Sequence, residues 1–191
     1  MKVLVACEYS GIVRDAFAAR GHDAWSCDIL PTERPGNHLQ CDVREILSDG
    51  WDLMIAHPPC TYLSYAGLRW FKAQPDRMDK ARAGFELFME MVNAPIPLIA
   101  IENPRGFPIK WYRKPDQIIQ PYHFGDPMTK ATCLWLKQLP PLMATLIIID
   151  PFKDWTTKAV RSPRVRSKTF QGIADAMASQ WSSQLFMEAQ S

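Results

Sequence analysis

The feature that most constrains the fold is a short apolar run, residues 53–56, that leads into a turn with two prolines and a cysteine. A run this short and this apolar suits a strand buried inside a parallel sheet. Pro58 and Pro59 restrict the backbone after it. Chemistry in open α/β sheets often lies at such strand ends, so Cys60 is a candidate nucleophile if its surroundings make it a thiolate. A small buried cysteine beside an ordinary loop is the alternative.

Further elements follow from the hydrophobic pattern along the chain. Short apolar runs predict strands at residues 3–6, 24–27, 38–43, 97–101, 131–136 and 146–149. Helical spacing predicts helices over 12–20, 76–92 and 169–188. In the second helix Arg77 lies off the apolar stripe, which consists of Met78, Ala81, Phe85, Phe88 and Val92. This alternation predicts an α/β fold with a mostly parallel sheet, in one domain over residues 1–191. If the strands at 3–6, 53–56 and 97–101 are neighbours, Glu8, Cys60 and Glu102 converge at one edge of the sheet.

Composition narrows the class of protein. The chain has 191 residues and a formal charge of +2, so any surface for nucleic acid must be local rather than a property of the whole molecule. Its five cysteines are an odd number, widely spaced and without a CxxC pair, which argues against a disulfide framework or a zinc site. No apolar run approaches membrane-spanning length, and we find no signal peptide. We therefore expect a cytoplasmic protein with no membrane partner.

The first part of the chain predicts a nucleoside site. A strand, a turn, a helix and a second strand ending at Asp28 follow one another, and an acid in that position can bind ribose hydroxyls. The phosphate-binding pattern GxGxxG is absent. Glu8 stands in the turn instead, where an acid would disfavour a pyrophosphate. The alternative is that Glu8 is a solvated turn residue without a role in binding. A cofactor with a positive centre and no phosphate fits better, and S-adenosylmethionine is the obvious candidate. Asp42 either caps a helical turn at 44–47 or accepts from an adenine amino group.

These pieces, in this order, resemble the DNA cytosine-5 methyltransferases over nearly the whole chain, as a shortened version. Pro59-Cys60 resembles the family's Pro-Cys nucleophile motif, and Glu102-Asn103-Pro104 resembles its Glu-Asn-Val motif. Residues 7–11 stand where the family has a Phe-x-Gly-x-Gly cofactor turn. Residues 122–136 resemble its Tyr-Gly-x-Pro-Gln-x-Arg-x-Arg segment, and residues 171–174 resemble the C-terminal segment that packs back beside the cofactor. The resemblance implies a Rossmann-like S-adenosylmethionine-dependent methyltransferase fold with helices on both faces of the sheet.

The resemblance also implies S-adenosylmethionine as cofactor, DNA as partner and a set of site residues. Cys60 would add to carbon 6 of cytosine, Glu102 would give a proton to ring nitrogen 3 from a raised pKa, and Lys130 would supply positive charge. The expected cofactor-binding residues are Cys7, Glu8, Tyr9, Ser10, Gly11, Asp28, Ile29, Asp42, Val43 and Pro58. The expected substrate-binding residues are Pro59, Thr61, Tyr62, Asn103, Arg105 and Thr132.

The chain departs from the family in two ways. Met128, Lys130 and Thr132 replace the glutamine and both arginines of the Gln-x-Arg-x-Arg segment. Where the family inserts a long target-recognition region, only residues 138–160 are available, which is too short for a DNA-reading domain. We therefore expect a compact, phage-like member without a separate recognition domain. A homodimer could supply the missing surface, with the proline-rich residues 107–121 as a candidate interface.

Three alternatives to cytosine-5 methylation of DNA remain open. His57-Pro58-Pro59-Cys60 also resembles the Asn/Asp-Pro-Pro-aromatic motif of amino-methyltransferases, although Cys60 and Glu102-Asn103 argue against that chemistry. The missing recognition region also suits an enzyme that acts on a free nucleotide. The third alternative is a degenerate homologue that binds cofactor or DNA without catalysis.

Overall fold

A computed structural model of the chain describes residues 1–151 and 167–182. Its strands are β1 (Lys2–Ala6), β2 (Asp23–Cys27), β3 (His38–Leu39), β4 (Leu53–Ala56), β5 (Leu98–Pro104), β6 (Gln117–Ile119) and β7 (Thr132–Lys137). Its α-helices are α1 (Ile12–Ala18), α2 (Arg77–Val92), α3 (Phe107–Trp111) and α5 (Gln171–Ser182). Three short 3₁₀ helices are η1 (Val43–Glu45), η2 (Tyr65–Trp70) and η3 (Pro121–His123).

The strands form one sheet in the order β3-β2-β1-β4-β5-β7-β6. The first five in this order are parallel, and β7 runs antiparallel to both β5 and β6. The chain moves outward from β1 to β2 and β3, and then returns to place β4 on the other side of β1. Ligands of open α/β sheets bind at such a switch point, outside the carboxyl ends of the strands. The predicted mostly parallel, Rossmann-like fold is confirmed, as is the adjacency of β1, β4 and β5.

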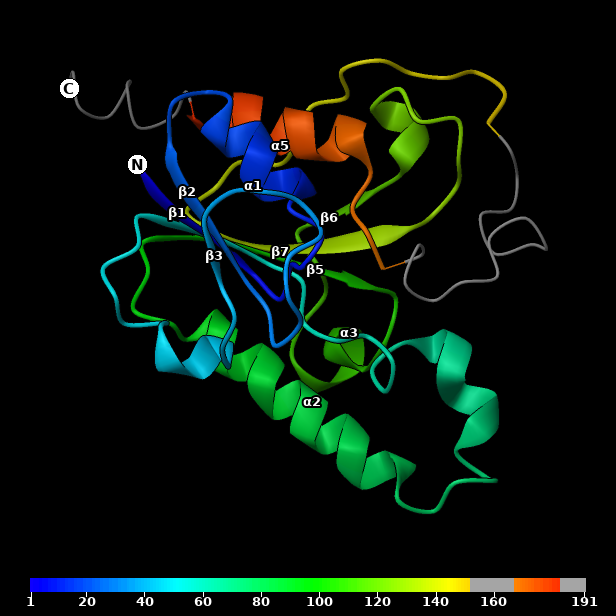
Figure 1. The fold of residues 1–191 in the computed structure, drawn as a ribbon. Helices are drawn as coiled ribbons and strands as arrows, with labels where there is room; N and C mark the ends of the chain where they lie inside the picture. The colour runs from blue at the N-terminus through cyan, green and yellow to red at the C-terminus, as the bar shows by residue number, and fades with distance from the viewer. Residues whose placement is uncertain (152–166, 183–191) are drawn as a thin grey trace.

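Helices cover both faces of the sheet: α1 and α5 lie on one face, and α2 and α3 lie on the other (Figure 1). The central strands alternate between the two cores. In β1, Val3 and Val5 join the core under α1 and α5, whereas Leu4 and Ala6 join the core under α2. A strand buried on both faces has no polar position, which is why β1 and β4 read as continuous apolar runs.

Strand β5 is longer than the predicted residues 97–101. It continues to Pro104 because β7 pairs with it antiparallel, with Glu102 opposite Leu134 and Asn103 opposite Cys133. Glu102 and Asn103 are therefore held in the body of the sheet rather than in a turn beyond it.

Helix α2 confirms the predicted span and most of the predicted apolar stripe: Ala81 and Phe88 are fully buried, and Phe85 and Val92 pack against the same core. Met78 is 38% exposed, so the prediction that it is a core residue is wrong. Arg77, expected off the apolar face, is buried, because its guanidinium group donates to the carbonyl oxygen of Thr61 and to Gln74.

Some predicted elements differ or fall outside the described residues. No strand forms at residues 146–149 in the described structure, where Leu146 makes one isolated bridge to Phe124 and Ile149 is exposed. The end of the predicted helix 169–188, from residue 183 on, and residues 152–160 of the predicted short connection 138–160 lie outside the described residues. Within residues 1–151 and 167–182, no helix has both the length and the apolarity needed to cross a membrane.

Candidate functional site

A pocket of about 610 Å³ opens at the carboxyl ends of β1, β2, β4 and β5. Its size is typical of small-molecule sites. Most of the predicted site residues line it: Cys7, Glu8, Tyr9, Ser10, Asp28, Ile29, Asp42, Val43, Pro58, Pro59, Cys60, Thr61, Glu102, Asn103 and Lys130. The fold therefore brings together residues that are up to 123 positions apart, from Cys7 to Lys130, at one switch point.

The turn after β1 is held in an unusual backbone conformation. Cys7 has φ 58° and Gly11 has φ 71°, both in the left-handed region. Gly11 suits its position, since a Cβ atom there would lie 2.5 Å from the Arg14 side chain. Burial, with help from the charges of Asp28 and Asp42, raises the pKa of Cys7 to about 12. Cys7 is thus a neutral thiol and a poor nucleophile.

Glu8 is buried and serves the start of helix α1. Its Oε1 accepts from the backbone N–H of Val13 at 2.8 Å, and its Oε2 accepts from that of Arg14 at 3.2 Å. The alternative that Glu8 is a solvated turn residue is wrong, because the residue is 5% exposed. In dinucleotide-binding folds a phosphate takes this place at the helix N-terminus. Here the protein's own carboxylate fills it, which disfavours a phosphate at this position.

Two further carboxylates line the same side of the pocket, at the ends of β2 and β3. Asp28 is half-buried, burial raises its pKa, and its Oδ1 accepts from the backbone N–H of Leu30 at 2.9 Å. Asp42 caps η1, as one of its two predicted roles requires: it accepts from the backbone N–H of Arg44 at 3.0 Å and from the Arg44 guanidinium at 3.1 Å. These hydrogen bonds, the backbone one foremost, lower the pKa of Asp42.

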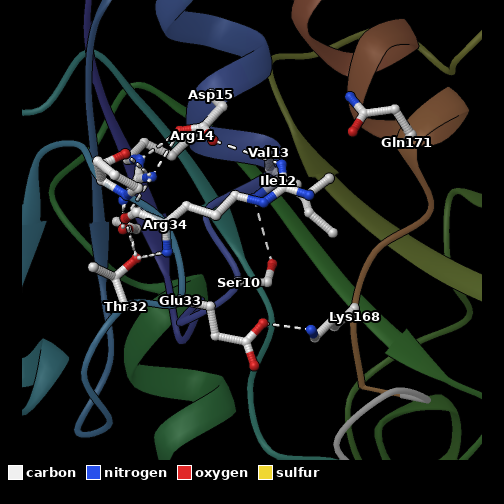
Figure 2. A network of polar contacts seen from close by, with 12 residues as sticks. Ser10, Ile12, Val13, Arg14, Asp15, Thr32, Glu33, Arg34, Lys168 and Gln171 are labelled. Atoms are coloured by element: carbon white, nitrogen blue, oxygen red, sulfur yellow. Dashed lines mark hydrogen bonds and ion pairs between the residues drawn. The ribbon is translucent and has the colours of Figure 1, made fainter.

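A buried arginine fixes the loop that follows Asp28 (Figure 2). The Arg14 side chain is 1% exposed and pairs with Asp15 at 2.7 Å. It also donates to Thr32 Oγ1 at 3.2 Å and to the carbonyl oxygen of Pro35 at 2.9 Å. These contacts tie the loop to α1 and thereby hold the Asp28 edge of the pocket.

The segment before α5 packs against the loop that follows Asp28 and also lines the pocket. Lys168 forms an ion pair with Glu33 (Figure 2), and Ser167 Oγ lies 3.0 Å from the hydroxyl group of Tyr9. Ser167, Lys168 and Thr169 all line the pocket. Residues 167–169 therefore lie beside the pocket, whereas residues 171–174, which carried the sequence resemblance, do not line it.

The proline turn at the other end of the pocket is tied to β5. Asn103, which is fully buried, donates from Nδ2 to the carbonyl oxygen of Pro58 at 2.8 Å. The carbonyl oxygen of Cys60 accepts from the backbone N–H groups of Leu63 and Ser64 at 3.1 and 2.9 Å. Cys60 thus sits in a turn that is hydrogen-bonded on both sides.

The pKa of Glu102 differs from the prediction. Burial acts to raise its pKa, but a 3.2 Å hydrogen bond from His57 Nδ1 and the positive charge of Lys130 outweigh it, so the pKa lies below its usual value. The predicted raised pKa is wrong, because the predicted pattern did not include His57 as a partner. Without substrate, Glu102 is a carboxylate.

Four predicted site residues do not line the pocket: Gly11, Tyr62, Arg105 and Thr132. The Tyr62 ring lies 4.9 Å from the Arg77 guanidinium, outside the pocket. Arg105 is exposed, and Thr132 is buried behind Glu102 with its hydroxyl donating to the carbonyl oxygen of Lys130.

Sequence reasoning also missed several pocket residues: Cys27, Leu30, Cys41, Arg44, His57, Leu87, Pro104, Ser167, Lys168 and Thr169. Among these residues, His57 could have been found from the sequence, because it stands directly before the two prolines.

No protein-family model and no curated protein matches the sequence. Among solved structures, the chain is similar to a candidate DNA modification methyltransferase encoded within a prophage of E. coli, with a TM-score of 0.49 and 16% sequence identity. The alignment covers 78% of this chain and 51% of that protein, so this chain spans about half of the other's length. What the structure itself defines is the class: a Rossmann-like α/β protein with a preformed pocket at its switch point.

Proposed function

We propose that the protein is an S-adenosylmethionine-dependent methyltransferase that acts at carbon 5 of cytosine in DNA through a covalent adduct on Cys60. One observation carries the proposal: Cys60 and Glu102 line the same pocket as Asp28 and Asp42. A thiol and a carboxylate suited to a pyrimidine ring therefore share a cavity with two carboxylates suited to a nucleoside.

The pocket fits such a cofactor in its donor and acceptor set. Asp28 and Asp42 are the residues that would accept from the ribose hydroxyls and the adenine amino group, and the exposed Ile29 offers apolar surface beside them. Glu8 already fills the place at which α1 would hold a phosphate. When bound, S-adenosylmethionine supplies an electrophilic methyl group.

The roles of the protein's own groups follow from the chemistry of the ring. Cys60 Sγ, as a thiolate, forms a bond to carbon 6, which opens the 5,6 double bond and makes carbon 5 nucleophilic. Nitrogen 3 takes up a proton as the ring electrons shift, and the Glu102 carboxylate holds that N–H by accepting its hydrogen bond. Once carbon 5 is methylated, a base removes its proton, the 5,6 double bond forms again and the bond between Sγ and carbon 6 breaks. The thiolate returns, and nitrogen 3 releases the proton that it took up.

A target base in duplex DNA has to leave the stack before it can reach Cys60, which costs about a few kcal/mol. The segment that follows Cys60 offers groups that could contact DNA. Tyr65 and Trp70 of η2 are 39% and 46% exposed, and Arg69 lies over the Trp70 ring. Aromatic rings stack on bases and guanidinium groups meet phosphates, so η2 is the proposed DNA contact.

The deciding experiment combines the protein with tritiated S-adenosylmethionine and DNA containing 5-fluorodeoxycytidine. Fluorine cannot leave carbon 5 as a proton does, so a cytosine-5 enzyme stays covalently attached. We expect a complex that survives denaturing electrophoresis and maps to Cys60 by mass spectrometry. Cys60→Ser should lose the complex, and Cys133→Ala, which removes a thiol outside the pocket, should keep it. Methyl transfer without an adduct would overturn the covalent mechanism.

Two observations favour methylation of an exocyclic amine as a second candidate. Glu102 is ionised in the free protein, and His57 stands where amino-methyltransferases carry Asn or Asp. The same experiment separates the two, because amine methylation would give tritium in N-methylated nucleosides, no trapped complex, and activity retained by Cys60→Ser.

A further inference from the structure

His57 carries a buried polar atom that the contacts described so far leave unsatisfied. Its side chain is 10% exposed and lines the pocket, and its Nδ1 hydrogen-bonds to Glu102. Its Nε2 is buried and has no hydrogen-bond partner among the described residues. An unpartnered buried polar atom is costly, so such an atom in a pocket indicates a place for a ligand group.

The partner of Nδ1 decides what kind of group Nε2 can bind. An ionised carboxylate only accepts hydrogen bonds, so Glu102 requires that Nδ1 carry the proton. In the neutral imidazole, Nε2 is then an acceptor. Asn103 offers a second one: its Nδ2 donates to Pro58, and its Oδ1 is buried without a partner among the described residues. Two residues that line the pocket thus hold buried acceptors without partners among the described residues, and such acceptors are satisfied by N–H or O–H donors.

We propose that His57 Nε2 accepts a hydrogen bond from the exocyclic amino group of the target base and selects cytosine over uracil and thymine. The inference rests on the proposed function, because it takes the pocket to hold a pyrimidine. Glu102, bonded to the same imidazole, is the residue proposed to face nitrogen 3, and the amino group is on the adjacent ring carbon. Uracil and thymine carry a carbonyl oxygen there, which would place acceptor against acceptor. His57 would then determine specificity directly, in addition to its hydrogen bond to Glu102.

The test measures binding rather than turnover. In the Cys60→Ala background, which cannot form the adduct, single-stranded oligomers of deoxycytidine and of deoxyuridine are titrated by fluorescence anisotropy in the presence of S-adenosylhomocysteine. Single strands avoid the cost of base flipping. We expect the deoxycytidine oligomer to bind roughly 10- to 100-fold more tightly, the range of one good polar contact to a base.

Two variants at the position separate the hydrogen bond from packing. His57→Ala should bring the two affinities to within about threefold, by weakening the deoxycytidine oligomer. His57→Gln should also reduce the ratio, but by strengthening the deoxyuridine oligomer, because its amide can donate as well as accept. His123→Ala, which alters a histidine outside the pocket, should keep the parental ratio. Thermal unfolding of each variant establishes that it is folded.

Several results would overturn the proposal: no preference in the Cys60→Ala parent, no binding of either oligomer, or an unchanged ratio in folded His57→Ala. Nitrogen-15 spectra give a further readout, since the chain has only four histidines. They should show a protonated Nδ1 and an unprotonated Nε2 at His57, and the opposite tautomer would contradict the proposal.

The outcome also stays separate from that of the proposed function. A trapped Cys60 adduct, together with an affinity ratio that is unchanged in His57→Ala, would support the proposed enzyme class and contradict this inference. A preference for the deoxycytidine oligomer that depends on His57, without a trapped adduct, would support this inference and contradict the covalent mechanism.

Discussion

At the scale of single residues, Glu102 shows how much a partner changes a catalytic group. A carboxylic acid in a dry pocket is expected to hold its proton. Here the hydrogen bond from His57 and the charge of Lys130 reverse that effect. Glu102 therefore meets the substrate as an acceptor, and the proton on nitrogen 3 has to arrive with the base or from solvent.

The lowered pKa of Glu102 predicts a pH dependence of stability. A group whose pKa is lower when folded stabilises the protein above its unfolded pKa of about 4.3, and that stabilisation is lost as the pH falls through the folded value. We expect the free energy of unfolding to decline below about pH 5 more steeply in the wild type than in Glu102→Gln. Chemical denaturation across this range measures it. Glu86→Gln, which removes an exposed acid on α2, should follow the wild type. Parallel curves for wild type and Glu102→Gln would contradict the assignment.

The site residues show where sequence reasoning succeeds and fails. Cys60 and Glu102 could be placed in one pocket because each follows, or ends, an apolar run and parallel strand ends share an edge. The pKa of Glu102 could not be predicted, because it depends on a contact between His57 and a residue 45 positions away. The place of the Tyr62 ring beside Arg77 could not be predicted for a similar reason, because Arg77 is 15 positions further along the chain.

At the scale of elements, helix α1 depends on the Glu8 carboxylate at its N-terminus. Glu8→Gln removes the charge and leaves one backbone N–H facing an amide. We expect a loss of about 1–3 kcal/mol of unfolding free energy, the range for hydrogen bonds to charged groups. Denaturant titration measures the loss, and Glu86→Gln serves as a matched surface control. A stability equal to that of the control would show that the helix end does not need the charge.

The segment between Cys60 and α2 depends in turn on Arg77. This side chain donates to the carbonyl oxygen of Thr61 at 2.8 Å and to Gln74 at 3.0 Å, and it lies over the Tyr62 and Phe71 rings. Arg77→Lys keeps the charge but loses the planar, forked contact. We expect faster tryptic cleavage at Arg69 and Lys72 and lower methyl transfer, with cofactor affinity unchanged. Arg82→Lys, on the exposed face of α2, is the control. Wild-type cleavage rates in Arg77→Lys would rule out this anchoring role.

Strands that are apolar on both faces could be predicted from the sequence. Elements whose formation depends on pairing or packing with a distant segment could not. Strands β1 and β4 appear as continuous apolar runs because both of their faces are covered. Strand β6 and helix α3 were missed because they lie in a proline- and aromatic-rich stretch whose local signals favour a loop. The extension of β5 exists only because β7 lies beside it, which no local pattern shows.

At the scale of the whole molecule, both halves of the sheet contribute residues to the pocket. The ends of β1, β2 and β3 supply the carboxylates of the nucleoside side, and the ends of β4 and β5 supply the thiol and Glu102. The ion pair between Glu33 and Lys168 then links the loop after β2 to the segment before α5. A ligand that spans the pocket would therefore touch elements from most of the fold, so its binding should stabilise the whole molecule rather than one loop.

This linkage gives the last prediction. A ligand at one hundred times its Kd adds about 2.7 kcal/mol to the free energy of unfolding, and a chain of this size gains roughly 2–4 °C in Tm for each kcal/mol. We therefore expect S-adenosylmethionine or S-adenosylhomocysteine to raise Tm by about 5–11 °C in a thermal-shift experiment. ATP and NAD should do little, because Glu8 occupies the phosphate position at α1. Asp28→Asn should weaken the response to S-adenosylhomocysteine, and Asp23→Asn, on the exposed start of β2, should leave it intact. A shift with ATP or NAD and none with S-adenosylhomocysteine would mean that the pocket serves a phosphate-bearing ligand and that Glu8 gives up its place at the helix.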